Sequence, residues 1–281
     1  MKILDGKKLS EKILKRLKKE IKKEKLKLRL VVIQVGRDPI SKIFINQKEK
    51  TCKEIGIDFK LYQFPKNINQ DLLKKRIQKI AKPRLNSGII IQLPLPRKFD
   101  TKAILNIIPQ EKDIDVLSEK NQAQFCLGNL KILPPTLSGI IKLLKEYKIK
   151  IKGKHFVVMG AGRLIGLPLA FWLLRQKTTV SVLEKFTPDI SFFTKKADIL
   201  ISGVGKPGLI SGPMVKKDVV VIDAGLALKR GKLRGDVDFE SVSKKASYIT
   251  PVPGGVGPMT VACLLKNLIK LCQNYDPPAT L

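Results

Sequence analysis

Hydrophobic and polar positions alternate along the chain in blocks that predict strands and helices in turn. Short, nearly continuous apolar runs, such as Gly88–Ile91, are typical of buried parallel strands. Stretches with apolar residues three and four positions apart, such as 8–25, predict amphipathic helices. The predicted strands are 26–35, 57–64, 88–91, 155–159, 178–183, 198–202 and 219–223. The predicted helices are 8–25, 41–54, 69–81, 136–147, 164–175 and 258–272.

This order predicts an α/β fold with two domains, because strands that alternate with crossover helices form parallel sheets. A length of 281 residues with 43% hydrophobic content is enough for two cores. We expect a parallel-sheet domain at 1–120, completed by the C-terminal segment 253–281, and a Rossmann-like dinucleotide-binding domain at 121–252. Ligands of such sheets bind at the carboxyl ends of the strands.

Several function classes are disfavoured by the residue types of the chain. No apolar run reaches the length of about 18 residues that a transmembrane helix needs, and Met1–Asp5 lacks the basic-then-apolar order of a secretory signal. The four cysteines show no Cys-x-x-Cys spacing, which favours free thiols in a reducing compartment. The single histidine, His155, precedes an apolar run and fits a strand start. We therefore expect a cytoplasmic protein with no membrane segment and no metal site.

The net charge of +31, from 55 Lys+Arg against 24 Asp+Glu, brings nucleic-acid binding into question. Lysines are densest from Lys7 to Lys27, where they alternate with leucines and isoleucines. Aromatic residues make up 6% of the chain and are not interleaved with the basic residues as stacking platforms would be. A solvated lysine coat is the simpler interpretation, and an anionic ligand would also gain from this field. A non-catalytic, nucleic-acid-binding protein is kept as an alternative.

A glycine-rich turn follows the predicted strand 155–159. Its glycines, Gly160, Gly162 and Gly166, are spaced one residue wider than G-x-G-x-x-G. A turn of this kind lets phosphates approach the backbone and the helix N-terminus. The match alone is equally compatible with an ordinary tight turn, and its place between a strand and a helix favours dinucleotide binding.

Glu184 ends the next predicted strand. A carboxylate there can accept hydrogen bonds from the adenosine ribose hydroxyls and would repel a 2′-phosphate. This chemistry favours NAD over NADP, although Lys185 and Arg163 could still hold a phosphate. A surface glutamate at a strand end is the alternative interpretation.

Three segments carry a resemblance to a known family. They are Ser41–Lys50 with Ile55-Gly56-Ile57, Ile91-Gln92-Leu93-Pro94-Leu95-Pro96, and Tyr248–Ala262. Weaker matches lie at 112–115, 203–208 and 221–225. In this order and spacing the chain resembles the bifunctional methylenetetrahydrofolate dehydrogenase/methenyltetrahydrofolate cyclohydrolase family over nearly its whole length.

The resemblance implies two reactions on a tetrahydrofolate substrate. The methylene carbon of 5,10-methylenetetrahydrofolate loses a hydride to NAD or NADP, and water then opens the methenyl product to 10-formyltetrahydrofolate. By the same resemblance Lys48 activates the water, Gln92 fixes its geometry and Asp115 accepts hydrogen bonds from the pterin ring. A lysine in that role needs a lowered pKa.

The resemblance also implies the remaining site residues and a homodimer that forms through the dinucleotide domain. The substrate would lie against Phe44 and the backbone of Pro253, Gly254 and Gly255. The cofactor would be bound by Gly160, Ala161, Gly162, Gly166, Glu184, Lys185 and Gly205.

The chain departs from the family pattern in the residues that would handle protons and cofactor. Phe44 replaces a tyrosine and Val116 replaces a glycine. Gly160-Ala161-Gly162 stands where the family has G-R-S, and Glu184-Lys185 where it has H-S. The usual site for the NADP 2′-phosphate is therefore altered. These departures agree with NAD preference, and equally with a cyclohydrolase whose cofactor use is weakened.

Overall fold

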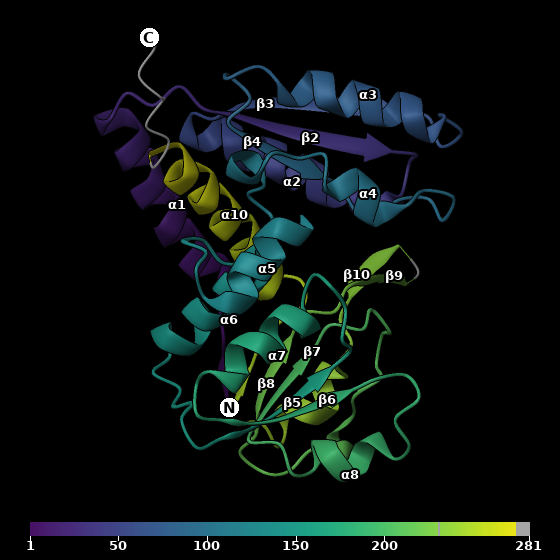
Figure 1. Ribbon diagram of the computed structural model, residues 1–281. Coiled ribbons are helices and arrows are strands. Elements are labelled where there is room, and N and C mark those ends of the chain that lie inside the picture. The colour runs from purple at the N-terminus through teal and green to yellow at the C-terminus, as the bar shows by residue number, and fades with distance from the viewer. Residues whose placement is uncertain (230, 274–281) are drawn as a thin grey trace. The chain divides into compact units, whose positions relative to one another are not determined.

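A computed structural model describes residues 1–229 and 231–273, and their contacts divide the chain into two compact units. The three-stranded unit comprises Lys12–Pro135 and, at the end of the described residues, Val261–Gln273. The six-stranded unit comprises Met1–Glu11 and Thr136–Thr260. Each unit is built on a parallel sheet (Figure 1), which confirms the predicted two-domain α/β fold.

The three-stranded unit has the strand order β3-β2-β4. Val31 of the central strand lies opposite Lys60 on one side and Ile89 on the other. The strands are β2 (Arg29–Val35), β3 (Asp58–Phe64) and β4 (Gly88–Ile91). The helices are α2 (Pro39–Ile55), α3 (Gln70–Ala81), α4 (Thr101–Leu105), the short 3-10 helix η1 (Gln110–Lys112) and α5 (Glu119–Leu127). Two long helices, α1 (Gly6–Lys23) and α10 (Val256–Gln273), contribute most of their length to this unit.

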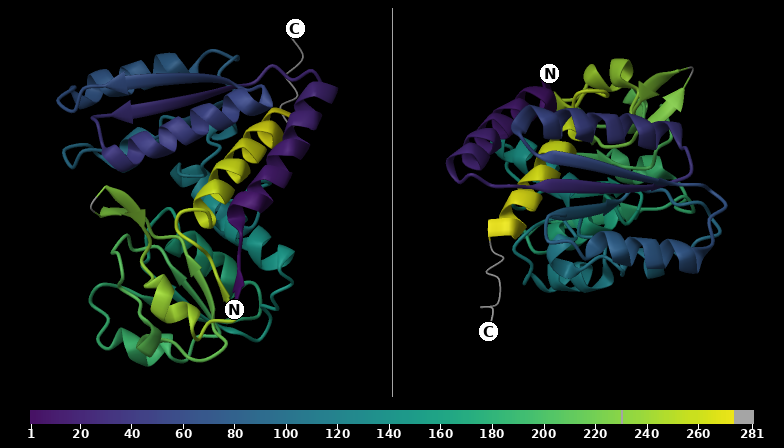
Figure 2. Two further views of the ribbon diagram at one scale, coloured as in Figure 1. Left: turned by 180° about the vertical axis from the view of Figure 1, so that it is seen from behind. Right: turned by 90° about the horizontal axis from the view of Figure 1, so that it is seen from above.

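Both faces of this sheet are covered, because β2 sends alternate side chains to opposite sides. Leu30 and Val32 pack into a core with α1, α2 and α10. Val31 and Ile33 pack on the other face with α3 and α4. In Figure 1, α2 and α3 accordingly run on opposite sides of β2, and in Figure 2 α1 and α10 lie side by side.

Local sequence signals set the ends of the helices that matter for the site. Asp38 caps α2 by accepting the backbone N–H of Ser41, Pro39 occupies the first turn, and the helix ends at Gly56 with φ of 86°. The predicted start at residue 41 was therefore two residues late. Asn69 caps α3, accepting the backbone N–H groups of Asp71 and Leu72.

The six-stranded unit has the strand order β1-β11-β8-β7-β5-β6, in which neighbouring strands are parallel. Its strands are β1 (Lys2–Ile3), β5 (His155–Met159), β6 (Thr179–Leu183), β7 (Ile199–Ser202), β8 (Val220–Asp223) and β11 (Tyr248–Ile249). A hairpin of β9 (Ala227–Lys229) and β10 (Lys232–Arg234) stands apart from the sheet. The helices are α6 (Pro135–Glu146), α7 (Gly166–Leu174), α8 (Ile190–Thr194), α9 (Phe239–Ser243) and the 3-10 helix η2 (Gly212–Met214).

The two compact units differ from the domain ranges expected from the sequence. Residues 1–11 join the six-stranded unit because β1 pairs with β11, a two-residue strand that periodicity could not reveal. Residues 121–135 pack with the three-stranded unit, and 253–260 with the six-stranded unit. Residues 274–281 of the expected C-terminal segment lie outside the described residues. No described helix combines the length and apolarity needed to cross a bilayer.

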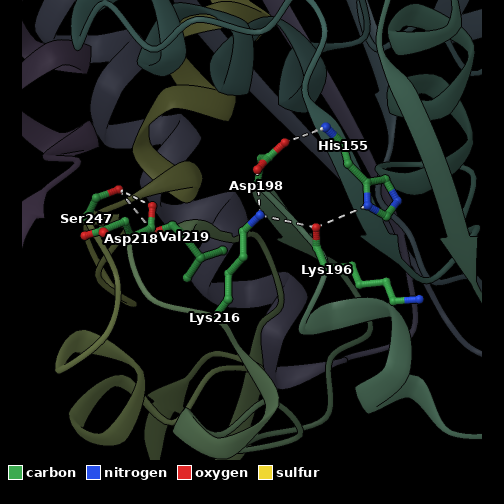
Figure 3. A network of polar contacts seen from close by, with 7 residues as sticks. All are labelled: His155, Lys196, Asp198, Lys216, Asp218, Val219 and Ser247. Atoms are coloured by element: carbon green, nitrogen blue, oxygen red, sulfur yellow. Dashed lines mark hydrogen bonds and ion pairs between the residues drawn. The ribbon is translucent and has the colours of Figure 1, made fainter.

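A polar network ties together the amino ends of several strands in the six-stranded unit (Figure 3). Asp198, just before β7, accepts the backbone N–H of His155 at 2.9 Å and the Lys216 ammonium at 2.6 Å. The His155 ring lies 3.3 Å from the carbonyl oxygen of Lys196. Burial acts to raise the pKa of Asp198, but these hydrogen bonds outweigh it and lower the pKa. His155 thus begins a strand and helps to hold the amino ends of the strands together, at the edge opposite their carboxyl ends.

Candidate active site

Lys48 and Gln92 form the centre of the candidate site in the three-stranded unit. Lys48 lies in the middle of α2 and is only 8% exposed. Its Nζ donates to Oε1 of Gln92 at 2.9 Å. Gln92 directly follows β4, where its backbone N–H still bonds to Ile33, so the pair lies at the carboxyl end of the sheet. The structure therefore brings together the two residues that the sequence paired.

The environment of Lys48 changes its proton affinity. Burial lowers the pKa of Lys48, and the charge of Asp115 acts in the opposite direction. Burial raises the pKa of Asp115 to about 6, partly offset by the positive charge of Lys48. The Nζ of Lys48 also lies 5.7 Å from the ring centroid of Phe44, one turn earlier on α2. All four predicted residues, Phe44, Lys48, Gln92 and Asp115, thus share one region of this unit.

The turn that carries Asp115 is held by its neighbour Asp113. The Asp113 carboxylate accepts the backbone N–H groups of Leu117 at 3.1 Å and Ser118 at 2.8 Å, and the Ser118 hydroxyl at 2.6 Å. The Asp113 carboxylate therefore stabilises the local fold, whereas the Asp115 carboxylate interacts with the charge of Lys48. Val116 has φ of 59°, so a valine here keeps the left-handed backbone that a glycine would favour.

The glycine-rich turn in the six-stranded unit lines a cavity of about 750 Å³. Gly160 has φ of 87°, and the backbone N–H of Ala161 donates to Oε1 of Glu184 at 2.7 Å. Of the predicted cofactor residues, the lining includes Gly160, Ala161, Gly162, Glu184 and Lys185.

The two other predicted cofactor glycines, Gly166 and Gly205, do not line this cavity but lie next to residues that do. A Cβ on Gly166 would overlap the carbonyl oxygen of Gly160, so only glycine lets α7 begin this close to the turn. Gly205, with φ of 78°, lies between Val204 and Lys206, which do line the cavity. A Cβ on Gly162, in contrast, would meet nothing within 4 Å. An open glycine turn at the end of β5 fits the approach of a pyrophosphate.

Comparison with known families identifies the family to which this chain belongs. The family description "Tetrahydrofolate dehydrogenase/cyclohydrolase, catalytic domain" matches residues 4–115. The description "Tetrahydrofolate dehydrogenase/cyclohydrolase, NAD(P)-binding domain" matches residues 134–276. The chain belongs to the tetrahydrofolate dehydrogenase/cyclohydrolase family. A nicotinamide dinucleotide is thereby its cofactor, and a tetrahydrofolate its substrate.

Relatives of this family resemble the chain from end to end. The Bifunctional protein FolD of Nitratiruptor sp. is 46% identical over 97% of this chain and 98% of its own. The crystal structure of the bifunctional FolD of Campylobacter jejuni has a TM-score of 0.92 at 43% identity, covering 98% of this chain and 99% of its own. A Trypanosoma brucei dehydrogenase-cyclohydrolase solved with NADP has a TM-score of 0.91 at 34% identity, covering 96% of this chain and 97% of its own.

The predicted substrate loop of this family member lies in the six-stranded unit. Pro253 is exposed, Gly254 is half-buried with φ of 111°, and Gly255 is buried. A Cβ on Gly255 would come within 2.8 Å of Thr250. Pro253 and Gly254 are thus accessible to a ligand, whereas Gly255 is needed for close packing of the loop.

Sequence reasoning missed several polar residues that organise the two sites. The Ser41 hydroxyl donates to the carbonyl oxygen of Leu93 at 3.3 Å, and the Gln92 amide nitrogen donates to the same oxygen at 3.0 Å. Asp236, which is buried, accepts the backbone N–H of Lys206, a residue that lines the cavity of the glycine-rich turn, and the buried Asp223 accepts that of Val237 next to Asp236. The glycines next to these aspartates, Gly225 and Gly235, were the signal available in the sequence, because they leave room for the carboxylates.

Proposed function

We propose that this enzyme oxidises 5,10-methylenetetrahydrofolate to the methenyl form with a nicotinamide dinucleotide and hydrolyses that product to 10-formyltetrahydrofolate. The observation that carries the hydrolysis is the buried amine of Lys48, held at 2.9 Å by Gln92 in a chain that belongs to this family. The dehydrogenase half is supported by the open glycine turn and its cavity.

In the hydrolysis, Lys48 acts as the base. Its lowered pKa increases the fraction of neutral amine, which accepts a proton from water as the water oxygen bonds to the methenyl carbon. The second O–H proton then leaves as the carbonyl of the formyl group forms and the bond from that carbon to N5 breaks. N5 takes that proton, the formyl group stays on N10, and the proton held by Lys48 is released to solvent. Gln92 keeps the amine in place, since its own amide nitrogen is fixed on the Leu93 carbonyl.

Asp115 and Phe44 hold the substrate beside that amine. An ionised Asp115 can accept hydrogen bonds from the amino and ring N–H groups of a pterin. Phe44 offers its ring for stacking but has no hydroxyl, so it cannot take part in proton transfer.

The cofactor is held by the turn at the end of β5. A bound nicotinamide would supply the hydride acceptor, and the protein would supply its orientation. Gly160, Ala161 and Gly162 would hold a pyrophosphate with backbone rather than side chains, and Gly166 lets α7 begin close to this turn.

The preferred cofactor is NAD. Glu184 lies at the end of β6 on the cavity wall, where its carboxylate would accept the ribose hydroxyls and repel a 2′-phosphate. Its bond to the Ala161 N–H fixes that carboxylate beside the turn. Lys185 and Lys206 line the same cavity, and Glu184 is the group that opposes their pull on an extra phosphate.

The enzyme is a homodimer formed through the six-stranded unit. The exposed face of α7 carries Leu167, Phe171 and Leu174, which are 44%, 46% and 67% exposed. These positions recur at the spacing of one helical face, next to the sheet's edge strand β6. We also place this dimer in the cytoplasm, in keeping with four cysteines that form no disulfide in the described part of the chain.

The proposal is tested by two assays on the purified protein: 5,10-methylenetetrahydrofolate with NAD or NADP, and 5,10-methenyltetrahydrofolate alone. We expect hydrolysis, and a kcat/KM for NAD about tenfold or more above that for NADP. Glu184→Ser should reverse this ratio because the repulsion is gone while Lys185 stays. Glu54→Ser, which removes an exposed glutamate from α2, is the matched control.

Each other outcome contradicts a part of the proposal. Equal kcat/KM for the two cofactors would contradict the role of Glu184. Hydrolysis without reduction of either cofactor would mean that the altered glycine turn has abolished the dehydrogenase activity. A folded protein with neither activity would contradict the enzyme assignment as a whole.

A further inference from the structure

Two buried carboxylates lie between the loops of the six-stranded unit and take no part in the proposed chemistry. Asp236 follows β10 and is fully buried, and Asp223 ends β8 and is 3% exposed. Burying carboxylates is costly unless donors surround them. Their contacts therefore show what they hold in place.

Asp236 fixes the loop that follows β7. Its Oδ2 accepts the Ser202 hydroxyl at 2.6 Å and the backbone N–H of Val204 at 2.8 Å. Its Oδ1 accepts the backbone N–H of Lys206 at 2.7 Å. Gly203, Val204 and Lys206 line the cavity of the glycine-rich turn, where the proposed cofactor would bind. One carboxylate thus sets the backbone of one wall of that cavity without lining it.

Asp223 fixes Asp236 in turn. Its Oδ1 accepts the backbone N–H groups of Gly225 at 3.0 Å and Asp236 at 3.1 Å, and its Oδ2 accepts that of Val237 at 2.9 Å. Its own N–H donates to the Thr250 hydroxyl at 2.7 Å, just before the loop of Pro253 and Gly254. Burial raises the pKa of Asp223 to about 6, while the three backbone donors oppose this rise.

The space around the pair admits no larger side chain. A Cβ on Gly225 would overlap the carboxyl group of Asp236, and a Cβ on Gly235 would overlap that of Asp223. The two carboxylates and the two glycines form one close-packed arrangement.

We propose that Asp236 is a positioning residue for the dinucleotide: its carboxylate holds Val204–Lys206 in the conformation that binds the cofactor. The identity of the ligand rests on the proposed function. An asparagine has one acceptor oxygen in place of two, so its amide group would face Val204 or Lys206 with N–H against N–H. The wall of the cavity would shift, and cofactor affinity would fall. Hydrolysis at Lys48 needs no cofactor and serves as an internal control.

The test compares Asp236→Asn with the wild-type enzyme by calorimetric titration of NAD and by both activity assays. We expect the Kd and KM for NAD to rise about tenfold or more, the magnitude for losing a charged hydrogen bond. The dehydrogenase kcat at saturating NAD and the hydrolysis of the methenyl substrate should stay within about threefold of wild type. Asp218→Asn makes the same chemical change at an exposed position of the same unit and is the control.

Ser202→Ala keeps the proposal testable if Asp236→Asn does not fold, because it removes one donor and leaves the carboxylate. It should raise the Kd for NAD about threefold to fivefold. An unchanged Kd in the variants that fold, or a proportional loss of both activities, would overturn the proposal. If Asp236→Asn weakens NAD binding but the wild-type protein does not oxidise the folate, the result would contradict the proposed function and still support the role of Asp236.

Discussion

The amine of Lys48 has surroundings that set it apart from the many exposed lysines of the chain. It is 8% exposed, bonded to a neutral amide oxygen, and near one carboxylate. Burial favours the neutral amine and Asp115 favours the ammonium, so the balance between them decides how much base is present at a given pH. The same balance makes the pH dependence of hydrolysis a test of the site.

Methenyl hydrolysis should increase with pH as Lys48 loses its proton. Because Asp115 raises the pKa of Lys48, Asp115→Asn should lower that pKa further and move the midpoint of this increase to lower pH. The variant should also lose about tenfold in kcat/KM, since an amide is a weaker partner for the pterin. The measurement is the pH profile of kcat for both enzymes.

Asp71→Asn, at an exposed position on α3, is the control for this profile and should leave the midpoint unchanged. A midpoint that stays in place in Asp115→Asn, or moves to higher pH, would show that Asp115 does not act on the base.

At the scale of elements, α2 and β4 place Lys48 and Gln92, the proposed catalytic pair, and both elements were predictable from the sequence. The apolar run of β4 and the helical spacing of α2 are strong local signals. Their side-by-side position follows from the parallel order β3-β2-β4. Short elements were not predictable: β1 and β11 have two residues each and exist only because they pair. The hairpin β9–β10 likewise gave no periodic signal.

The exposed face of α7 leads to a prediction about assembly. Phe171→Glu places a charge in the middle of the apolar stripe and should shift the protein from dimer to monomer, because a buried unpaired charge costs several kcal/mol. Sedimentation velocity measures the change. Leu127→Glu, at a leucine on α5 that is 66% exposed, should remain dimeric. A wild-type protein that sediments as a monomer would contradict the homodimer.

At the scale of the whole molecule, the sequence predicted two α/β domains and brought Lys48, Gln92 and the glycine turn to their strand ends. It could not place Asp223 and Asp236, since a buried carboxylate looks like any surface aspartate until its donors are known. The structural role of Asp113 was hidden for the same reason, because only the hydrogen bonds of the folded turn reveal it. Val116 shows that a left-handed position need not carry glycine.

The central claim is that a neutral Lys48 amine activates water. Lys48→Arg tests it most directly, because arginine keeps the positive charge but cannot lose its proton. Lys50→Arg makes the same exchange at an exposed position on α2 and is the matched control. The measurement is the initial rate of methenyltetrahydrofolate hydrolysis, corrected for the uncatalysed reaction. We predict a loss of about a hundredfold or more in Lys48→Arg and none in Lys50→Arg. A folded Lys48→Arg enzyme with more than about a tenth of the wild-type rate would contradict the claim.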